Sequence, residues 1–331
     1  MLRYYEFFIF TGSMRLIDPS VTDFEAIRRD FRWSVPEKIN IAYQVCDRHL
    51  QRAQQVAVYY ENAVGQRAKY SFADLKKLSD QFANALRAIG IGRGDRVAIV
   101  LPQTIETVIA HLAIHKLGAV SLPLAILFGP EALEYRLRDS GASAAIVHTS
   151  RYDDVMTLQP ELNDLRAVIG CRCGNPQAEF WSLLERGADQ FEMIETRADD
   201  PACLIYTSGT TGPPKGALVA HRAVIGNFTG FEMSQNFFPQ AGDVFWTPAD
   251  WAWTGGLWDA LLPALNYGIP IVAYEGGGFD AERVCKLMRD YAVTNAFIPP
   301  TALKMLRVLP DLKSRYNLKL RAIMSAGEQV G

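Results

Sequence analysis

Hydroxyl side chains, glycines and one lysine are concentrated in residues 206–216, which read YTSGTTGPPKG. Glycine lets backbone N–H groups turn toward a bound anion, because no Cβ stands in the way. The hydroxyl groups add short donors, and Lys215 adds a mobile positive charge. The segment directly follows the apolar stretch 202–206, which predicts a buried strand. A strand that leads into such a loop is typical of a polyphosphate-binding site.

Two better-known phosphate-binding motifs do not fit these residues. A P-loop ends in Gly-Lys followed by Ser or Thr, whereas Pro214 precedes Lys215 and Gly216 follows it. The dinucleotide fingerprint needs a helix to open at once, and Pro213 beside Pro214 disfavours that. The alternative is an ordinary surface loop, because Gly, Ser, Thr and Pro are common in loops. Hydroxyls, glycines and a lysine rarely combine in this way by accident, which favours phosphate binding.

The segment resembles the signature of the adenylate-forming (AMP-binding) superfamily, which includes acyl- and aryl-CoA synthetases and peptide-synthetase adenylation domains. Three further segments resemble that superfamily, in the right order along the chain. FRWSVPEKIN at 31–40, with VCDR at 45–48, resembles the leader of acetyl- and medium-chain acyl-CoA synthetases. TPADWAWTGG at 247–256 resembles their carboxylate-site segment, and SAGEQ at 325–329 resembles their adenine-contacting turn.

The resemblance implies a two-step reaction. A carboxylate oxygen attacks the α-phosphorus of ATP and pyrophosphate leaves, after which the coenzyme A thiolate attacks the acyl-adenylate to give a thioester and AMP. Two anions must meet in the first step, so oriented donors, a cation and Mg²⁺ are needed to offset their repulsion. The resemblance therefore implies an acyl-CoA synthetase, an acid–thiol ligase that uses ATP, Mg²⁺ and coenzyme A with a small carboxylic (fatty) acid.

The resemblance also assigns roles to single residues. The candidate catalytic residues are Lys215 and Thr207. The candidate nucleotide-binding residues are Thr207, Ser208, Gly209, Thr210, Thr211, Gly212, Lys215, Gly216, Gly327, Glu328 and Gln329. The candidate residues at the acid substrate are Trp253, Thr254, Gly255 and Ala326. No side chain is assigned to a metal ion.

Alternatives remain at each of these segments. Trp251, Trp253 and Trp258 can build a rigid apolar wall, but tryptophans also make good core residues. Thr254 and its neighbours are uncharged, which favours a simple carboxylate over an amino acid, although Asp250 is close in sequence. The turn at 325–329 can also border the site without direct contact.

The histidines and the paired cysteines predict little chemistry. His111 and His115 are four residues apart, but the zinc-protease pattern needs a Glu directly after the first histidine, and Leu112 holds that place. We therefore expect a partly solvated helix face. His221 is expected at a helix start or behind the site and not as a catalytic base. Cys171 and Cys173 suggest metal or redox chemistry only weakly, because no second cysteine pair accompanies them.

Bulk properties bound the class of protein. The 331 residues are 49% hydrophobic, enough for a large core. The net charge of −2, with both signs interspersed, argues against a nucleic-acid-binding surface or a polybasic membrane patch. Five scattered cysteines fit a reducing compartment, and no stretch has transmembrane length. The expectation is a soluble cytoplasmic protein, and its oligomeric state stays open.

Apolar periodicity predicts alternating strands and helices, hence parallel sheet with right-handed crossovers. The predicted strands are 96–101, 119–123, 142–148, 202–206, 269–274, 294–299 and 320–325. The predicted helices are 71–90 with Ser71 as N-cap, 107–117, 130–139, one capped by Asp280, and one capped by Thr301 that runs through Leu306. The resemblance implies an α/β fold of stacked subdomains with mostly parallel sheets, as in the large N-terminal domain of the superfamily.

The expected domains are an irregular leader (1–30), a first α/β lobe (31–195) and a second lobe with the phosphate loop (196–331). Residues 190–201 are expected to connect the lobes, and residues 1–13 are an artefact if Met14 is the true start. The superfamily's magnesium-linked glutamate, ribose-binding aspartate and small C-terminal domain with a catalytic lysine are not found. We therefore expect the second lobe to be incomplete and the chain alone to be a poor catalyst. Alternative functions are an aryl-CoA or carrier-protein-loading ligase, or an inactive nucleotide-binding fragment.

Overall fold

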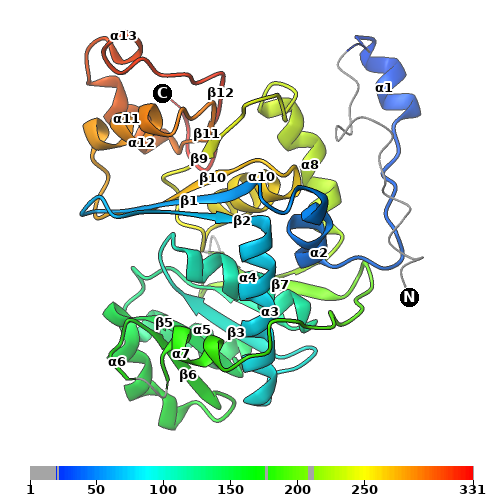
Figure 1. The fold of residues 1–331 in the computed structure, drawn as a ribbon, viewed down its shortest axis with the longest axis vertical. Coiled ribbons are helices and arrows are strands. Elements are labelled where there is room, and N and C mark those ends of the chain that lie inside the picture. Colours follow the sequence, from blue (N-terminus) through cyan, green and yellow to red (C-terminus); the bar gives the residue numbers. More distant parts are fainter. Residues whose placement is uncertain (1–19, 21, 176–177, 208–211, 331) are drawn as a thin grey trace.

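A computed structural model describes residues 20, 22–175, 178–207 and 212–330 (Figure 1). Two six-stranded sheets organise this part of the chain. The first sheet consists, in spatial order, of β6 (Ala167–Cys171), β5 (Ala144–His148), β3 (Arg96–Val100), β4 (Val120–Pro123), β7 (Pro201–Thr207) and β8 (Lys215–Ala220). The second consists of β12 (Ala322–Met324), β11 (Asn295–Phe297), β9 (Phe245–Trp246), β10 (Ile271–Glu275), β1 (Val56–Asn62) and β2 (Arg67–Ser71).

Each sheet is parallel except at one edge. In the first sheet β8 runs antiparallel to β7, and in the second β2 runs antiparallel to β1. The α/β fold with mostly parallel sheets is thus confirmed. Because β1 pairs with β10, and β2 joins the same sheet through β1, sheet membership does not follow chain order. The two sheets therefore do not coincide with the two lobes expected on either side of residue 195, and the domain division stays a prediction.

Helices connect and cover the strands. They are α1 (Phe24–Asp30), α2 (Ile41–Val45), η2 (Asp47–Arg52), α3 (Phe72–Ala88), α4 (Ile105–Lys116), α5 (Pro130–Ser140), α6 (Thr149–Leu158), η3 (Gln159–Glu161), α7 (Phe180–Glu185), α8 (Ala223–Ser234), α9 (Thr254–Gly256), η4 (Leu257–Leu261), α10 (Leu262–Asn266), α11 (Ala281–Asp290), α12 (Pro300–Arg307) and α13 (Leu312–Tyr316). Figure 1 shows α1 standing away from both sheets, and none of its residues is buried. The leader, expected to be irregular, therefore contains a helix.

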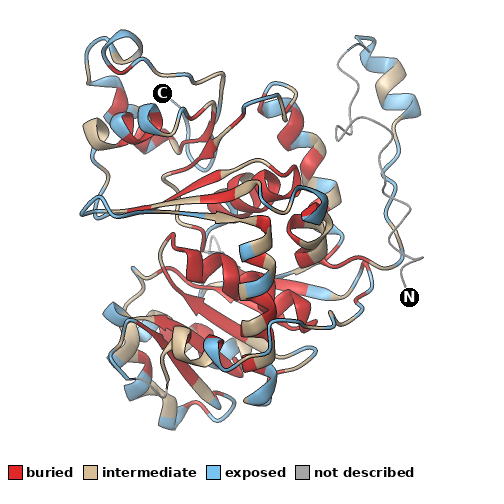
Figure 2. Cartoon of the chain, viewed as in Figure 1, coloured by how far each residue is buried: buried red, intermediate tan, exposed pale blue. Residues whose placement is uncertain are grey.

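The core lies on both faces of each sheet. Along β3, Val97 and Ile99 join the large core between the two sheets, whereas Ala98 and Val100 pack on the opposite face with residues of α5 and α6. This alternation follows from the period-two direction of strand side chains. The helix α4 lies in the central layer and is buried along its whole length (Figure 2).

Local signals place most helix ends as predicted. Ser71 and Asp74 form a reciprocal capping box at the start of α3. Asp280 caps α11 by accepting a hydrogen bond from the backbone N–H of Arg283 at 2.8 Å. The expected cap at Thr301 is wrong, since Thr301 lies inside α12, which begins with Pro300. Pro suits the first helical position, because its fixed φ matches the helix and it has no N–H to leave unpaired there.

Candidate active site

The phosphate-loop candidate is the connection of a β-hairpin. Thr207 ends β7, Lys215 begins β8, and the two residues are register partners in the antiparallel pair. Both are exposed. Gly212 has a left-handed φ of +91°, with open space where a Cβ would lie, which glycine adopts without strain. Ser208, Gly209, Thr210 and Thr211 lie outside the described residues, so their predicted roles stay predictions.

Side chains of α5 hold this hairpin from the outer face of the first sheet. The hydroxyl of Tyr206 donates to Asp139 Oδ2 at 2.5 Å, and the hydroxyl of Tyr135 donates to the carbonyl oxygen of Pro214 at 3.0 Å. Burial, with the hydrogen bond to Asp139, raises the pKa of Tyr206, so the phenol stays protonated as a donor. The two ends of the loop are therefore fixed on a supported strand pair.

The carboxylate-segment candidate begins a helix at the edge of the core. Trp253 is the N-cap residue of α9, and Thr254 and Gly255 are its first two residues. Trp253 is 43% exposed, and its ring meets that of Phe128 edge-on at a centroid distance of 5.6 Å. The other two tryptophans, Trp251 and Trp258, are buried in the core. Of these three tryptophans, Trp253 alone therefore offers its ring to a ligand.

Gly255 lies against an aromatic ring that the sequence did not single out. A Cβ built on Gly255 would lie 2.5 Å from Cε1 of Phe297, a residue of β11. Phe297 is the register partner of Met324 in β12, the strand that leads into the turn at 326–329. Phe297 thus connects the carboxylate segment to the adenine-turn candidate.

The adenine-turn candidate is an exposed turn after β12. Gly327 has a left-handed φ of +97°, and Ala326, Glu328 and Gln329 are exposed. The hydroxyl of Thr301 hydrogen-bonds both carboxylate oxygens of Glu328 at 2.9 Å, which holds this side chain against α12. Among the described residues, no hydrogen bond joins this turn to the phosphate hairpin.

A crevice between the two sheets is the feature that sequence reasoning missed. Its lining residues follow the carboxyl ends of strands β3, β4, β9 and β10 and continue into α11: Pro102, Gln103, Ile126, Leu127, Trp246, Thr247, Pro248, Asp250, Tyr274, Gly276, Gly277, Gly278, Phe279, Asp280, Arg283 and Val284. The space encloses about 220 Å³. The three successive glycines, one residue after the predicted strand 269–274, were the signal that could have found it.

The crevice lies where both sheets reverse their strand order. In the first sheet β4 and β5 lie on opposite sides of β3, and in the second β10 and β11 lie on opposite sides of β9. Ligands of open α/β sheets bind outside the carboxyl ends of the strands at such switch points. Here two switch points face one crevice, which makes it the strongest candidate for a substrate cleft.

Two polar groups point to a ligand in the crevice. The indole Nε1 of Trp246 is buried and has no hydrogen-bond partner among the described residues. Burial raises the pKa of Asp250, whose carboxylate also accepts from the backbone N–H of Ala252 at 2.9 Å. Gln103 spans the two sheets by donating to the carbonyl oxygen of Ala249 at 2.6 Å.

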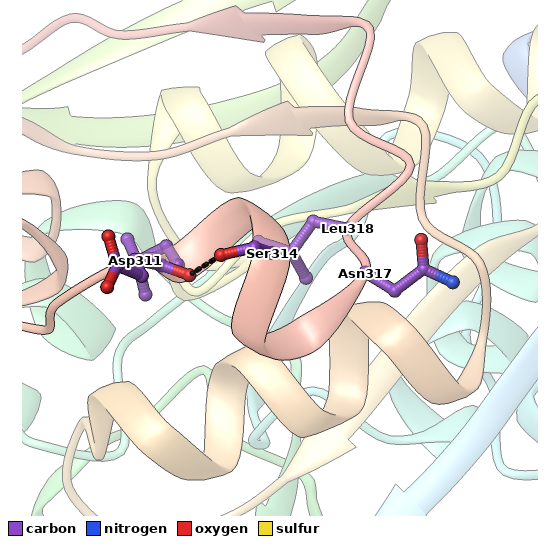
Figure 3. A pocket seen from close by; sticks show the side chains of 5 residues that line it. Asp311, Ser314, Asn317 and Leu318 are labelled. Atoms are coloured by element: carbon purple, nitrogen blue, oxygen red, sulfur yellow. Dashed lines mark hydrogen bonds between the residues drawn. The ribbon is translucent and has the colours of Figure 1, made fainter.

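A second hollow, separate from the crevice, lies at the short helix α13 (Figure 3). Asp311, Leu312, Ser314, Asn317 and Leu318 line it, and Ser314 Oγ donates to the carbonyl oxygen of Asp311 at 3.1 Å. None of the predicted site residues lines this hollow, so we do not assign it to the site.

The expectation of a partly solvated histidine face on α4 is wrong. His111 and His115 are 2% and 1% exposed, because α4 is enclosed between the two sheets. His221 lies just before α8, is fully buried, and accepts at Nδ1 from the backbone N–H of Ile41 at 3.2 Å. Across the described ranges, no three His, Cys, Asp or Glu side chains are placed to hold a metal ion.

No helix in the described part of the chain combines the length and apolar character needed to cross a bilayer. All five cysteines are free thiols.

Comparison with known proteins agrees with these features. The acetyl-coenzyme A synthetase of Methylobacillus flagellatus is 31% identical over 91% of this chain and 49% of its own length. The human mitochondrial acyl-coenzyme A synthetase ACSM4 is 28% identical over 93% of this chain and 54% of its own length. The chain thus spans about half the length of the curated relatives it matches.

Solved structures show the same fold. The acyl-CoA synthetase of Brucella canis superposes with a TM-score of 0.80 at 29% identity, over 89% of this chain and 54% of that one. The ATP-bound MatB of Rhodopseudomonas palustris gives 0.75 at 26% identity, over 88% and 55%. The AMP-binding enzyme family matches residues 46–331. The chain therefore belongs to the AMP-binding enzyme family.

Proposed function

We propose that the protein activates a carboxylic acid with ATP to an acyl-adenylate and then transfers the acyl group to the thiol of coenzyme A, releasing AMP and pyrophosphate. The observation that carries the proposal is the register pairing of Thr207 and Lys215 across the mouth of the glycine- and hydroxyl-rich loop. This pairing places a cation and a hydroxyl side by side where a polyphosphate chain would enter.

The roles in the first step divide between the hairpin and the two other segments. Residues 207–212, Lys215 and Gly216 hold the triphosphate through backbone N–H groups, hydroxyls and the ammonium group. Lys215 and Thr207 stabilise the charge that builds on the leaving pyrophosphate, and one well-placed donor in such a site is worth about 3 kcal/mol. The turn Gly327 to Gln329 receives the adenine. Mg²⁺ enters with ATP as part of the substrate.

The acid lies beside Trp253, Thr254, Gly255 and Ala326. The half-exposed ring of Trp253 and the ring of Phe297 behind Gly255 make this surface apolar, which suits the hydrocarbon part of an acid. Relatives named for acetyl- and acyl-coenzyme A synthesis support an aliphatic acid.

Coenzyme A takes the crevice between the sheets. The hairpin and the acid segment account for ATP and the carboxylate, whereas the crevice at the paired switch points is left for the third substrate. The unpaired donor of Trp246 suits an amide carbonyl oxygen of its pantetheine arm. The five free thiols support a reducing compartment such as the cytoplasm.

Binding of each substrate to the purified chain, measured by calorimetry, tests this function. We expect MgATP and coenzyme A to bind, and ATP–pyrophosphate exchange by the full gene product over a panel of carboxylates to show which acid is activated. Exchange with aliphatic acids supports the proposal. Exchange with aromatic acids alone would instead favour an aryl-CoA ligase. A folded chain that binds neither MgATP nor coenzyme A contradicts it.

A further inference from the structure

The glycine loop that lines the crevice is held at both of its ends. Gly276, Gly277 and Gly278 are exposed, and Gly277 and Gly278 have no atom within 4 Å of an ideal Cβ position, so little packing restrains them. After the loop, Asp280 caps α11. Before it, Glu275 ends β10 and reaches out of its own sheet.

Glu275 joins the two sheets. From the first sheet, Arg172 Nη1 donates to both carboxylate oxygens of Glu275 at 2.8 and 2.9 Å, and His148 Nε2 lies 3.8 Å away. From the second sheet, the hydroxyl of Tyr60 donates to the same carboxylate. Burial and the hydrogen bond to Glu275 raise the pKa of Tyr60 to about 12, so Tyr60 stays a donor at neutral pH.

Arg172 adopts a backbone conformation that residues with side chains rarely adopt. It follows β6 directly and has a φ of +61°. Glu179 holds this turn, because its carboxylate accepts from the backbone N–H groups of Arg172 at 2.8 Å and Cys173 at 3.1 Å. Such left-handed residues cluster at functional sites, where the surrounding structure imposes the conformation.

The guanidinium of Arg172 also faces a second carboxylate. Its Nη2 lies 3.7 Å from Glu106 Oε1 on α4, which accepts from Trp181 Nε1 at 2.9 Å. The other oxygen of Glu106 is buried without a hydrogen-bond partner among the described residues. Arg172 is therefore attracted to negative charge on α4 and on β10, which lie on the two sides of the junction between the sheets.

We propose that Arg172 is a positioning residue for the thiol substrate: its ion pair with Glu275, in which Nη1 donates to both carboxylate oxygens, fixes the Gly276–Gly278 loop and so sets the width of the crevice. This inference rests on the proposed function, because it needs coenzyme A to occupy the crevice. Arg172 itself does not line the crevice, and it acts through Glu275 and the loop that follows.

Three variants of the full chain test the inference. Arg172→Met removes the guanidinium and keeps the apolar stem, whereas Arg172→Lys keeps the charge but not the planar fork. Arg138→Met is the matched control, since Arg138 pairs with Glu134 one turn away on the exposed face of α5 at 2.9 Å. The measurements are the Kd of coenzyme A, the Kd of MgATP, and hydrogen–deuterium exchange of the peptide that contains residues 275–279.

We expect Arg172→Met to raise the Kd of coenzyme A about tenfold, because the loop loses the charge-assisted hydrogen bonds that hold Glu275, and to speed exchange in the loop. The Kd of MgATP stays within about twofold of wild type, Arg172→Lys recovers part of the affinity for coenzyme A, and Arg138→Met behaves as wild type. Such a split between ligands does not arise from a general loss of stability.

Other results contradict either the positioning role of Arg172 or the assignment of coenzyme A to the crevice. Unchanged exchange and unchanged coenzyme A affinity in Arg172→Met overturn the positioning role, and so does an equal loss of affinity for both ligands. A wild-type chain that binds MgATP but not coenzyme A overturns the assignment of the crevice under the proposed function. In that case, faster loop exchange in Arg172→Met would mean that Arg172 holds the two sheets together and has no role in binding the thiol substrate.

Discussion

Phe297 fills the space that a side chain on Gly255 would need. A Cβ on residue 255 would lie 2.5 and 2.6 Å from two ring carbons of Phe297, closer than carbon atoms approach without displacement. Because Phe297 is buried in β11 at 4% exposure, its ring has little room to move. The carboxylate-segment candidate at Gly255 and the strand β11 are therefore fitted to each other.

Gly255→Ala is expected to destabilise the protein by about 1–3 kcal/mol, the usual cost of overpacking a core. Urea unfolding measures this change. Gly226→Ala is the matched control, because Gly226 lies within α8 with nothing within 4 Å of its Cβ position. That control should leave stability unchanged or raise it by up to about 1 kcal/mol. Equal stability of the two variants would show that the ring of Phe297 moves aside at no cost in free energy.

Lys116→Met is expected to cost about 3–5 kcal/mol of unfolding free energy. Lys116 is fully buried, its ammonium donates to Asp80 Oδ1 at 2.6 Å, and it lies 3.0 Å from Asp47 Oδ1. Removing the cation leaves the partly buried Asp47 without this partner and leaves the fully buried Asp80 with Lys76 alone.

The control for Lys116 is Arg315→Met. Arg315 and Glu282 form a pair at 2.9 Å with both side chains 46% exposed, so its loss should cost no more than about 1 kcal/mol. Chemical denaturation of both variants gives the comparison, and similar losses would contradict the account of the buried cluster.

Acid should destabilise the protein through the buried histidines. Burial lowers the pKa of His111 to about 3 and that of His221 to about 4, and it lowers the pKa of His115 as well. An unfolded chain titrates these groups near 6.5. The folded protein then binds fewer protons than the unfolded chain between pH 6.5 and about 4. Stability is complete above this window and falls as the pH drops through it.

Each such histidine should remove about 2 kcal/mol of unfolding free energy at pH 5 relative to pH 7. His111→Leu tests this, because His111 makes no ring hydrogen bond with the described residues and leucine fits an apolar site. The variant should lose about 2 kcal/mol less than wild type between pH 7 and pH 5. A loss as steep as that of wild type would mean that His111 does not stay neutral in the fold.

Lys215→Ala should raise the Kd of MgATP about tenfold or more, since a hydrogen bond to a charged group is worth about 1.5–3 kcal/mol. Because Lys215 is exposed at the hairpin, stability should change by less than about 0.5 kcal/mol. Lys77→Ala, on the exposed side of α3, is the control for loss of one positive charge. Calorimetric titration supplies both constants, and matching values in the two variants would remove Lys215 from the phosphate site.

Local chemistry was enough to predict most elements. Ser71 with Asp74, and Asp280 alone, predicted where α3 and α11 begin, because caps act on the first turn of their own helix. The strand before the phosphate loop, β7, is also predicted by a local signal, the apolar stretch 202–206. Where two local signals competed, as Pro300 and Thr301 did at α12, the sequence order alone did not show which one begins the helix.

Features made by distant residues were not predictable in the same way. The face of α4 with His111 and His115 was expected to be partly solvated, but both sides of α4 are covered by sheets whose strands lie far apart in the chain. Apolar residues all around that helix were the available signal. The crevice likewise brings residues that follow β3 and β4 together with residues that follow β9 and β10, a juxtaposition that local patterns do not encode.

A crystal structure of the chain soaked with MgATP tests the central claim most directly. The account predicts the triphosphate within hydrogen-bonding distance of Lys215 Nζ and of backbone N–H groups in residues 207–212. Phosphates bound elsewhere, with this hairpin making no contact to them, would contradict it.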